Sequence, residues 1–449
     1  MATTAGAKKG LWSTIRRIAA SDRISGLIML GFALTGLVLA NLPATAHAFE
    51  TVAETHLFIP YTNLDLPIGH WAQDGLLTIF FLTVGLELKQ ELTTGSLANP
   101  KAAAVPMLCA VGGMIAPPIL FLAVTALFSQ IGPGEPGTLI LTTTGSSIPF
   151  SEMSHGWAVP TATDIAFSLA VLALFAKALP GSIRAFLMTL ATVDDLLAII
   201  LIAVFFSSIN AWYWFIGIVG VLAWIMMFEA GVHPTLAGVL VGLLTPSREM
   251  HGELSPRAER YANKLQPFSA LLALPIFALF ATGVHFESMS PLLLASPLVI
   301  ALIVALVVGK PLGIITTAWL STHVGGLKMA KGLRVRDMIP AAVACGIGFT
   351  VSFLIASLAY KNAELSAEAR FGVLVASLIA AAISGVLLSR QSKRFEKTAA
   401  AAAADAEDDE SIDGDGIGQP SHTTEPATPT EHPGTLADGT ASVEIDFRH

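Results

Sequence analysis

Residues 185–209 read AFLMTLATVDDLLAIILIAVFFSSI, and Asp194 and Asp195 are the only charged residues of this apolar run. An α-helix rises about 1.5 Å per residue, so Asp194 lies roughly 15 Å along the helix from Arg184, the preceding charge. That depth is about half of the ~30 Å hydrocarbon core of a bilayer. Two carboxylates at this depth mark an ion or proton site more often than a helix cap or a loop. The pair therefore predicts a cation or proton site inside a membrane protein.

The composition of the chain also predicts a membrane-embedded fold. The 449 residues are 53% hydrophobic and only 13% charged, against about 25% charged in soluble domains, and the mean hydropathy is +0.68. No stretch between the apolar segments is long enough for a soluble domain. We therefore expect an all-α polytopic membrane protein with a single helical bundle. The apolar segments are 26–43, 72–88, 102–128, 161–178, 185–208, 211–228, 231–245, 267–284, 291–321, 338–359 and 371–389.

The two ends of the chain differ from this body. Residues 1–23 are basic and precede the first apolar run, which Ala46-His47-Ala48 follows. This arrangement fits either a signal peptide with an A-x-A cleavage site or an uncleaved first spanning helix. We favour the helix, because the A-x-A lies several residues beyond the apolar run. Residues 396–449 are acidic and rich in Gly, Pro and Thr, and they predict a disordered tail because they have too little apolar surface to fold.

Lysine and arginine in the loops predict the orientation of the bundle, since both favour the cytoplasmic side. Both termini are then cytoplasmic, and residues 24–390 form the transmembrane domain. One conflict remains, because the path from outside near Ser208 to inside near Arg248 needs an odd number of crossings but contains two apolar segments. Basic residues mark 1–23, 89–101, 177–184, 248–264, 328–336 and 390–397, whereas 44–71, 129–160 and 285–290 have none.

Lys310 is a further charge inside an apolar segment, and Pro311 follows it at once. Lysine side chains can snorkel to the membrane interface along their stems, but Lys310 is more than about ten residues from the nearer end of residues 292–323, or some 15 Å along a helix. A buried ammonium group needs an anionic partner. The aspartate pair is the obvious candidate.

Asp164 belongs to a segment in which helix is weakened, because Pro160 lacks a backbone donor and Thr163 competes for backbone hydrogen bonds. Far along the chain, CGIGFT at 345–350 interrupts another apolar segment with two glycines. Paired, interrupted segments in the two halves of a chain indicate a transporter of inverted repeats with discontinuous helices. Asp164 either neutralises the positive helix ends at such a break or caps a helix at the surface.

Together these motifs resemble those of the bacterial NhaA-type Na⁺/H⁺ antiporters. In chain order they are TDIAF (163–167), VDDL (193–196), GVH (231–233), GKPLG (309–313) and GIGFT (346–350), preceded by VGLELK (84–89). The resemblance runs from about residue 20 to 390 and so also favours an uncleaved first helix. It implies an NhaA-like bundle of about 10–12 transmembrane helices, with inverted repeats and two discontinuous, crossed helices.

The resemblance also implies roles for the matched residues. Asp195 corresponds to the principal carboxylate, which binds Na⁺ or Li⁺ and protons in turn, and Asp194 to the second carboxylate, which pairs with Lys310. Asp164 and Lys310 resemble the charges that compensate the dipoles of the two broken helices. The positions at the breaks are Thr163, Gly346, Gly348 and Thr350.

Three more residues match positions linked to the pH response of the family. Glu87 and Glu91 lie four residues apart, on one face of a helix, and match acids of the cytoplasmic funnel. His233 matches a histidine implicated in pH dependence, although a lone histidine is as well explained by packing.

The chemistry of an aspartate pair suits exchange. Na⁺ prefers oxygen ligands and carboxylates also bind protons, so one pair can hold either but not both. Burial and a neighbouring like charge raise the pKa of a carboxyl group, whereas a nearby ammonium group lowers it. Because the two carboxyl groups are adjacent, we expect the pair to titrate as a coupled unit. If the site opens alternately to each side and moves only when loaded, the inward proton gradient expels Na⁺. The resemblance implies electrogenic, pH-regulated exchange of two protons per Na⁺.

The expected partners follow from this function. They are Na⁺, Li⁺, H⁺ and the lipid bilayer of the bacterial inner (plasma) membrane, with a possible homodimer, no nucleic acid, no cofactor and no enzyme activity. A Na⁺-coupled symporter of an organic anion, on a related fold, is the main alternative, and a cation channel is another. Lys310 opposite the pair favours antiport, and no polar pocket for an organic substrate is evident.

The chain departs from the family pattern in two places. Family members place three crossings between the aspartate-pair helix and the basic loop near Arg248, and one helix's worth of sequence is missing here, within residues 209–245. Asn263 and Gln266 also stand where histidines can occur, which points to an altered pH response.

Overall fold

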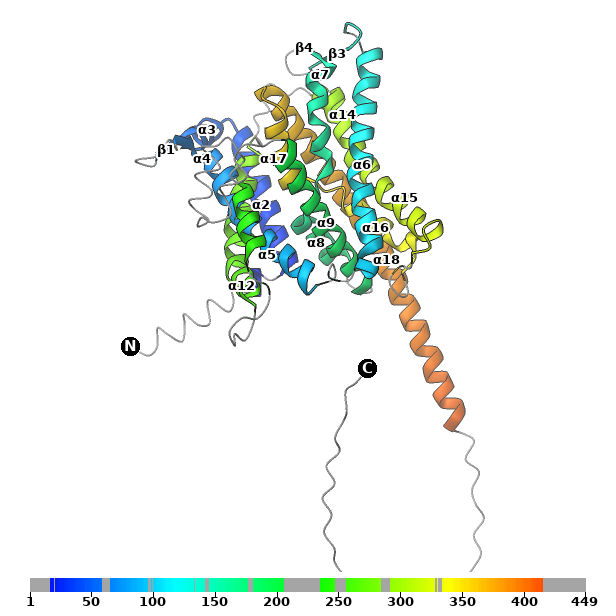
Figure 1. Cartoon of the computed structure of the whole chain (residues 1–449). Coiled ribbons are helices and arrows are strands. Elements are labelled where there is room, and N and C mark those ends of the chain that lie inside the picture. The colour runs from blue at the N-terminus through cyan, green and yellow to red at the C-terminus, as the bar shows by residue number, and fades with distance from the viewer. Residues whose placement is uncertain are drawn as a thin grey trace, which may run out of the picture. The chain divides into compact units, whose positions relative to one another are not determined.

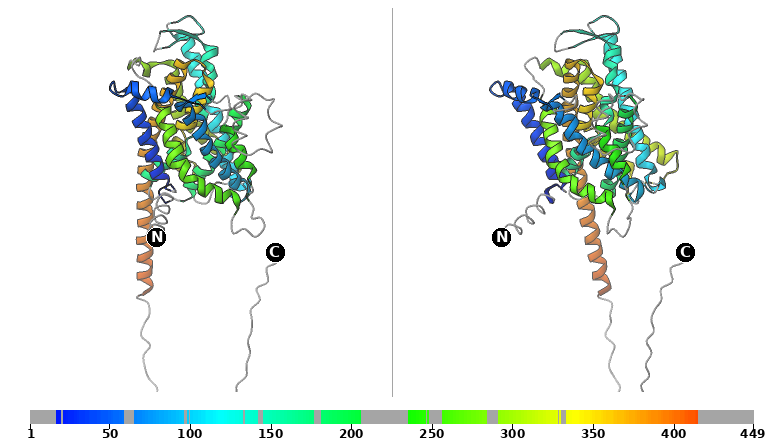
Figure 2. Two further views of the ribbon diagram at one scale, coloured as in Figure 1. Left: turned by 90° about the vertical axis from the view of Figure 1, so that its left-hand side faces the viewer. Right: turned by 60° about the vertical axis from the view of Figure 1, so that its left-hand side comes forward.

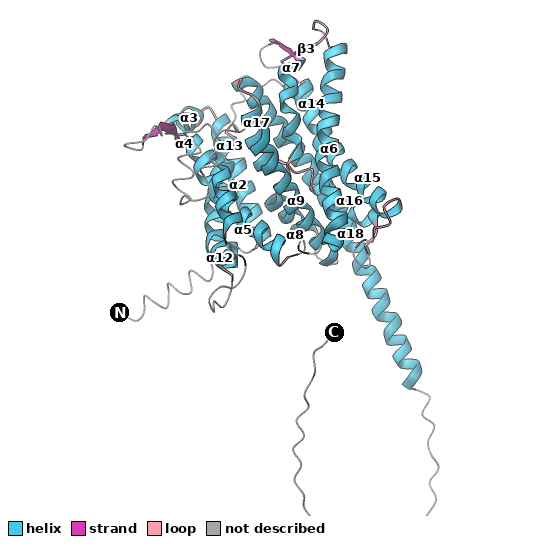
Figure 3. Ribbon diagram, in the orientation of Figure 1, coloured by secondary structure: helices cyan, strands magenta, loops and turns pink. Residues whose placement is uncertain are grey.

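The computed structural model describes residues 17–414, apart from 20, 59–64, 96–97, 99, 133, 142–144, 177–180, 206–234, 246, 248–255, 284–290, 328 and 330–332. The chain divides into two compact units, Met1–Lys397 and Thr398–His449. The first unit is a helical bundle with two short antiparallel hairpins, β1 (His56–Phe58) with β2 (Asp65–Pro67) and β3 (Thr138–Ile140) with β4 (Ser147–Pro149) (Figures 1 and 3).

The helices follow one another with few long connections. In chain order they are α2 (Asp22–Asn41), α3 (Ala46–Glu54), α4 (Ile68–His70), η1 (Trp71–Leu76), α5 (Leu77–Thr93), α6 (Pro100–Ile131), α7 (Phe150–Met153), η3 (Ser154–Thr161), α8 (Ile165–Phe175), α9 (Gly181–Phe205), α11 (Thr235–Leu244), α12 (Arg257–Phe268), η5 (Ser269–Ala273), α13 (Leu274–Ala281), η6 (Pro291–Ala295), α14 (Pro297–Val304), η7 (Ala305–Gly309), α15 (Lys310–His323), η8 (Val335–Met338), α16 (Ile339–Ala344), α17 (Phe349–Ala359) and α18 (Ala363–Gly414).

The all-α membrane class predicted from the apolar segments is confirmed. Among the described residues, five helices are long and apolar enough to cross a membrane, and two bent helix pairs raise that number to seven. The predicted segment 211–228 lies outside the described residues. The five are Ile24–Asn41, Ala103–Ile131, Ala258–Ala281, Pro297–His323 and Ala363–Thr398.

The two ends of the bundle differ in charge. One end carries α3, α4, α7 and both hairpins in every view, and we call it the hairpin end (Figures 1 and 2). Its elements belong to segments 44–71 and 129–160, which have no lysine or arginine. The opposite end, where α5 ends and α12 begins, we call the basic end (Figure 1). Lys89, Arg260 and Lys264 belong to those two helices.

Helix α11 packs closely along α5. A side chain at Gly238 would meet the backbone of Thr78, and one at Gly242 would meet the backbone of Gly85, so the two helices run in the same direction. Leu244 therefore lies towards the basic end. The residues that join α9 to α11, 206–234, lie outside the described residues.

Helix α18 is longer than the composition predicts. It continues to Gly414, through the first part of the segment 396–449 that we expect to be disordered. The alanine run 399–404 explains the continuation, because alanine has the highest intrinsic helix propensity. Residues 415–449 lie outside the described part of the chain.

Two spans are broken, as the interrupted segments predict. Residues Phe150–Thr161 and Ile165–Phe175 meet at 49°, and Val335–Ala344 and Phe349–Ala359 meet at 57°. The breaks touch, because the backbone N–H of Asp164 donates to the carbonyl of Ile347 at 2.7 Å. A Cβ atom at Gly348 would lie 3.3 Å from the carbonyl oxygen of Ala162 in the first break, and one at Gly346 would lie 2.5 Å from the carbonyl oxygen of Leu306 in η7, so the second break packs closely on both sides. The two discontinuous helices are therefore crossed.

Candidate ion site at the helix crossing

Asp164 lies between the first turns of two helices. It is the N-cap of α8, where its Oδ1 accepts the backbone N–H of Phe167 at 2.9 Å. Its Oδ2 accepts the backbone N–H of Thr350, in the first turn of α17, at 3.2 Å. The residue is only 3% exposed. One carboxyl group thus faces the positive N-terminal ends of both half-helices.

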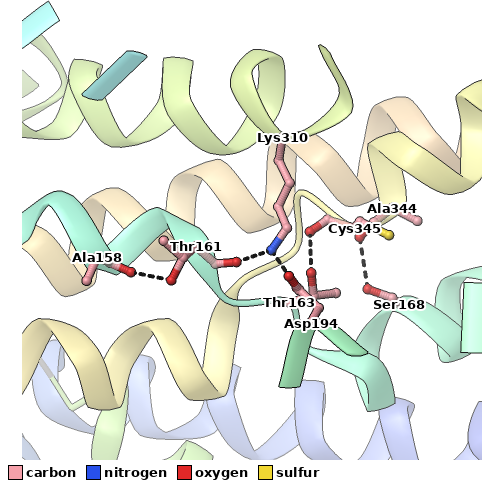
Figure 4. Close-up of polar contacts among 8 residues, drawn as sticks. All are labelled: Ala158, Thr161, Thr163, Ser168, Asp194, Lys310, Ala344 and Cys345. Atoms are coloured by element: carbon pink, nitrogen blue, oxygen red, sulfur yellow. Dashed lines mark hydrogen bonds and ion pairs between the residues drawn. The ribbon is translucent and has the colours of Figure 1, made fainter. Parts of the chain in front are cut away.

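The C-terminal end of α16 is satisfied by hydroxyl groups from the other broken span. Thr163 Oγ1 donates to the carbonyl of Cys345 at 3.0 Å, and Ser168 Oγ donates to the carbonyl of Ala344 at 2.9 Å (Figure 4). Both donors are buried. The Ala344 carbonyl also accepts the backbone N–H of Ile347 at 3.1 Å. The carbonyl groups at this helix end are therefore hydrogen-bonded without a charge.

The C-terminal end of η3 receives a charged partner instead. Lys310, at the start of α15, donates through Nζ to the carbonyl of Thr161 and to Asp194 Oδ2, the latter at 2.8 Å (Figure 4). Lys310 and Asp194 are 1% and 2% exposed, so the salt bridge is buried. The ammonium group thus compensates a negative helix end and an aspartate together.

Asp194 keeps one oxygen atom for another partner. Its Oδ1 is buried and has no hydrogen-bond partner among the described residues. Asp195 follows it in α9, and its side chain lies outside the described part. An unpaired buried carboxylate oxygen is costly unless it takes up a cation or a proton. This atom marks the place where an ion can bind.

The remaining predicted residues are not part of these contacts. Glu87 is exposed and Glu91 is half-buried, both on α5 towards the basic end, and His233 lies outside the described residues. No cluster of three or more His, Cys, Asp or Glu that could hold a metal ion occurs within the described ranges. In the described part of the chain the crossing therefore holds Asp164, Asp194 and Lys310, whereas Glu87 and Glu91 lie elsewhere on α5.

Sequence analysis missed two parts of the crossing. The carbonyl of Thr161 is a backbone group, so no side-chain pattern could indicate it. Ser168 follows Asp164 by one helical turn and so shares its helix face, a signal that could have identified the hydroxyl as a partner of the second break.

Comparison with known proteins identifies close relatives. The family described as Na⁺/H⁺ antiporter 1 matches residues 16–218 and 208–388. The chain is 94% identical to the Na⁺/H⁺ antiporter NhaA of Bifidobacterium longum (strain NCC 2705) over 472 positions, with both chains fully covered. It is 83% identical to the protein of the same name from Bifidobacterium breve, over 471 positions and again with both fully covered. For Bifidobacterium adolescentis the identity is 75% over 415 positions, covering 87% of this chain and 90% of the relative.

The aligned length bears on residues 209–245. The alignment with the Bifidobacterium longum protein covers 472 positions, whereas this chain has 449 residues. The relative therefore has residues without a counterpart here, about as many as one membrane-spanning helix. The two family matches overlap at residues 208–218, at the beginning of the region where one helix's worth of sequence is expected to be missing.

Proposed function

We infer the mechanism of this chain from a firm premise, that it belongs to the NhaA-type Na⁺/H⁺ antiporter family, and we propose alternating access with Na⁺ and H⁺ competing for Asp194 and Asp195. The family makes the chain a multi-pass transporter of the bacterial membrane, not an enzyme, and its ions are Na⁺ and H⁺.

The observation that carries the proposal is the unequal use of the two Asp194 oxygens. Oδ2 is held by Lys310, whereas Oδ1 is buried and without a partner in the described part of the chain. In the proposed site Oδ1 and the carboxylate of Asp195 bind Na⁺. A proton on Asp195 removes the charge that attracts the cation, so the two ligands exclude each other. If the site changes sides only with Na⁺ or protons bound, and never with both, then Na⁺ leaves on one side in exchange for protons from the other.

The crossing supports movement of the site as a unit. Both helix N-termini face Asp164, and the C-termini face Lys310 or hydroxyl groups. Each orphaned backbone end therefore keeps its partner inside the membrane, where an unsatisfied group is expensive. The two broken spans keep the contacts between them if they shift together, and the Thr161 carbonyl keeps its partner if α15, which carries Lys310, moves with them.

Orientation and stoichiometry complete the proposal. The basic end faces the cytoplasm, since lysine and arginine favour that side, and both termini of the chain are cytoplasmic. Exchange is electrogenic, at two protons per Na⁺. Li⁺ can take the place of Na⁺ as the transported cation. The pH response involves Glu87, Glu91 and His233. The chain forms a homodimer.

Everted membrane vesicles with a ΔpH probe test this function. Added Na⁺ or Li⁺ should collapse a respiration-driven ΔpH, and Asp195→Asn should abolish the response. Asp65→Asn, which removes an exposed aspartate from the hairpin end, is the matched control and should behave as wild type. Retained exchange in Asp195→Asn would reject the site.

The same vesicles distinguish the two alternatives. A Na⁺-coupled symporter predicts Na⁺ movement that needs an organic anion, and a channel predicts Na⁺ flux without any proton movement. Antiport alone predicts Na⁺ flux that needs no organic anion and is matched by a proton flux in the opposite direction.

A further inference from the structure

A second buried carboxyl group lies outside the crossing. Glu368 is in the second turn of α18 and is fully buried, with 0% exposure. Ser296, the N-cap of α14, donates its hydroxyl to Glu368 Oε1. The other oxygen, Oε2, is buried and has no hydrogen-bond partner within the described residues. Nothing in the crossing uses this group.

The charges around Glu368 do not compensate it. Glu364, one turn earlier on α18, and the Tyr360 hydroxyl at the end of α17 both interact with it electrostatically. Glu152 of α7 acts on Tyr360 in the same way. Arg370 lies on the same helix but acts on His70 of α4. Among the described residues no lysine, arginine or histidine forms a salt bridge with Glu368.

A carboxyl group in such surroundings needs a proton or a cation. Burying an uncompensated charge is expensive, and the group avoids this by binding a positive ion. Too few oxygen ligands surround Glu368 to bind Na⁺. Within the described ranges one hydroxyl, that of Ser296, bonds to the carboxyl group, and no cluster of three or more His, Cys, Asp or Glu that could hold a metal ion is present. A proton needs a single oxygen atom, and Oε2 provides it.

Glu368 is also connected to the crossing. Tyr360 donates its hydroxyl to the carbonyl of Met153, immediately before η3. A Cβ atom at Gly156 would lie 1.9 Å from that hydroxyl oxygen, so the ring fits against η3 only because the residue is glycine. The far end of η3 is Thr161, whose carbonyl accepts from Lys310. One short helix thus joins the neighbour of Glu368 to the partner of Asp194.

We propose that Glu368 is a proton-binding site of the hairpin-end half of the bundle, held by Ser296 and coupled through Tyr360 and η3 to Lys310. If the hairpin end faces outward, the site takes protons from the external medium. It then makes exchange sensitive to external pH, separately from Glu87 and Glu91 towards the basic end. This last step rests on the proposed function, whereas proton binding itself does not.

Infrared spectroscopy tests proton binding without any transport. The full chain in lipid vesicles is titrated between acidic and alkaline buffer, and the carbonyl stretch of protonated, buried carboxyl groups is followed. Glu368→Gln should remove one such band. Glu54→Gln, which removes an exposed carboxyl group from α3, should leave the band unchanged. Identical buried-carboxyl bands in wild type and Glu368→Gln would overturn the proposal.

Exchange in oriented proteoliposomes tests the coupling. External pH is varied at constant internal pH, and the proton concentration at half-maximal rate is determined. Ser296→Ala should shift the proton concentration at half-maximal rate roughly tenfold, because a hydrogen bond to a charged group contributes about a factor of ten to an equilibrium constant. Glu368→Gln should abolish the dependence of the exchange rate on external pH. The dependence of the exchange rate on internal pH should stay unchanged in both variants.

The outcomes separate the two proposals. Lower rates with unchanged profiles in Glu368→Gln and Ser296→Ala would make the pair a packing contact and overturn the coupling. Absence of exchange in the wild type would reject the proposed function, while the infrared band would still report whether Glu368 binds a proton.

Discussion

The two broken spans have the same backbone design but different polar groups. Both bend by about the same angle, 49° and 57°, in mid-span. The first break carries a charge in Asp164 and hydroxyls in Thr163 and Ser168, whereas the second, CGIGFT at 345–350, has two glycines and the hydroxyl of Thr350 but no charged residue. As a result the first span supplies partners for itself and for the second (Figure 4).

The difference also extends to the C-terminal ends. The carbonyl of Thr161 is met by the ammonium group of Lys310, and those of Ala344 and Cys345 are met by neutral hydroxyls. Among the described residues of the two spans, only Thr161 of the first is therefore hydrogen-bonded to the charge that holds Asp194. The comparison suggests that the first span carries the electrostatic link to the ion, and that the second completes the geometry.

Lys310→Ala tests the charged end of the first span and should have the largest effect. Removing one partner of a buried ion pair costs about 3–5 kcal/mol, because the other charge remains buried. We expect a large loss of thermal stability, measured on detergent-solubilised protein, and a shifted pH profile of exchange. The double variant Lys310→Ala/Asp194→Asn should recover part of the stability. An unchanged profile in Lys310→Ala would mean that the lysine is not linked to the ion.

Asp164→Asn tests the shared carboxyl group. The amide keeps one acceptor, but it loses the charge and presents an NH₂ group to a helix N-terminus. Two charge-assisted contacts weaken, at about 1.5–3 kcal/mol each, so exchange should fall by roughly a hundredfold or more. Rates are compared in everted vesicles at equal protein. A variant as active as wild type would show that the dipole ends need no charge.

Gly346→Ala tests the geometric role of the second span. The added methyl group would lie 2.5 Å from the carbonyl oxygen of Leu306, and overpacking of this kind costs about 1–3 kcal/mol. We expect reduced thermal stability and exchange with an unchanged pH profile. Ala342→Gly, at a buried position of α16 before the break, is the comparison for a change of one methyl group. A shifted pH profile in Gly346→Ala would contradict the division of roles.

Thr163→Val and Ser168→Ala test the neutral end and should have the smallest effects. Each removes one hydroxyl donor from a buried carbonyl, which costs about 1 kcal/mol. Thermal unfolding should be slightly earlier, and exchange should remain within a fewfold of wild type. Loss comparable to that of Lys310→Ala would show that hydroxyls and charge are equally important at the two breaks.

Much of the site could be predicted from the chain alone. Asp164, Asp194 and Lys310 stand out because a charge in a long apolar segment is rare, and Pro160 and Gly346 mark the breaks by their backbone properties. Charge balance predicts that Lys310 pairs with the two aspartates, and the family resemblance implies Asp194 in particular; in the structure Lys310 Nζ and Asp194 Oδ2 lie 2.8 Å apart. The number of crossings in residues 209–245 could not be predicted, because charge counts and segment lengths conflict there.

Other contacts could not be predicted from sequence. The carbonyl of Thr161 has no side-chain signature, and Glu368 lies near a helix end, where an acidic residue usually faces water. Its one hydrogen bond comes from Ser296 at the start of α14, 72 residues earlier in the chain. Only packing between such elements decides whether a carboxyl group near a helix end is exposed or enclosed.

The sequence by itself determined the membrane environment, the buried charges and the two interruptions, because the cost of charge and of unpaired backbone in an apolar run is local. The tertiary structure decided which helix end each charge serves. Asp164 reaches Thr350 and Lys310 reaches Thr161 only after the broken spans cross. Which helix end a buried charge contacts depends on distances between segments that are far apart in the chain, and these distances cannot be inferred from the local sequence.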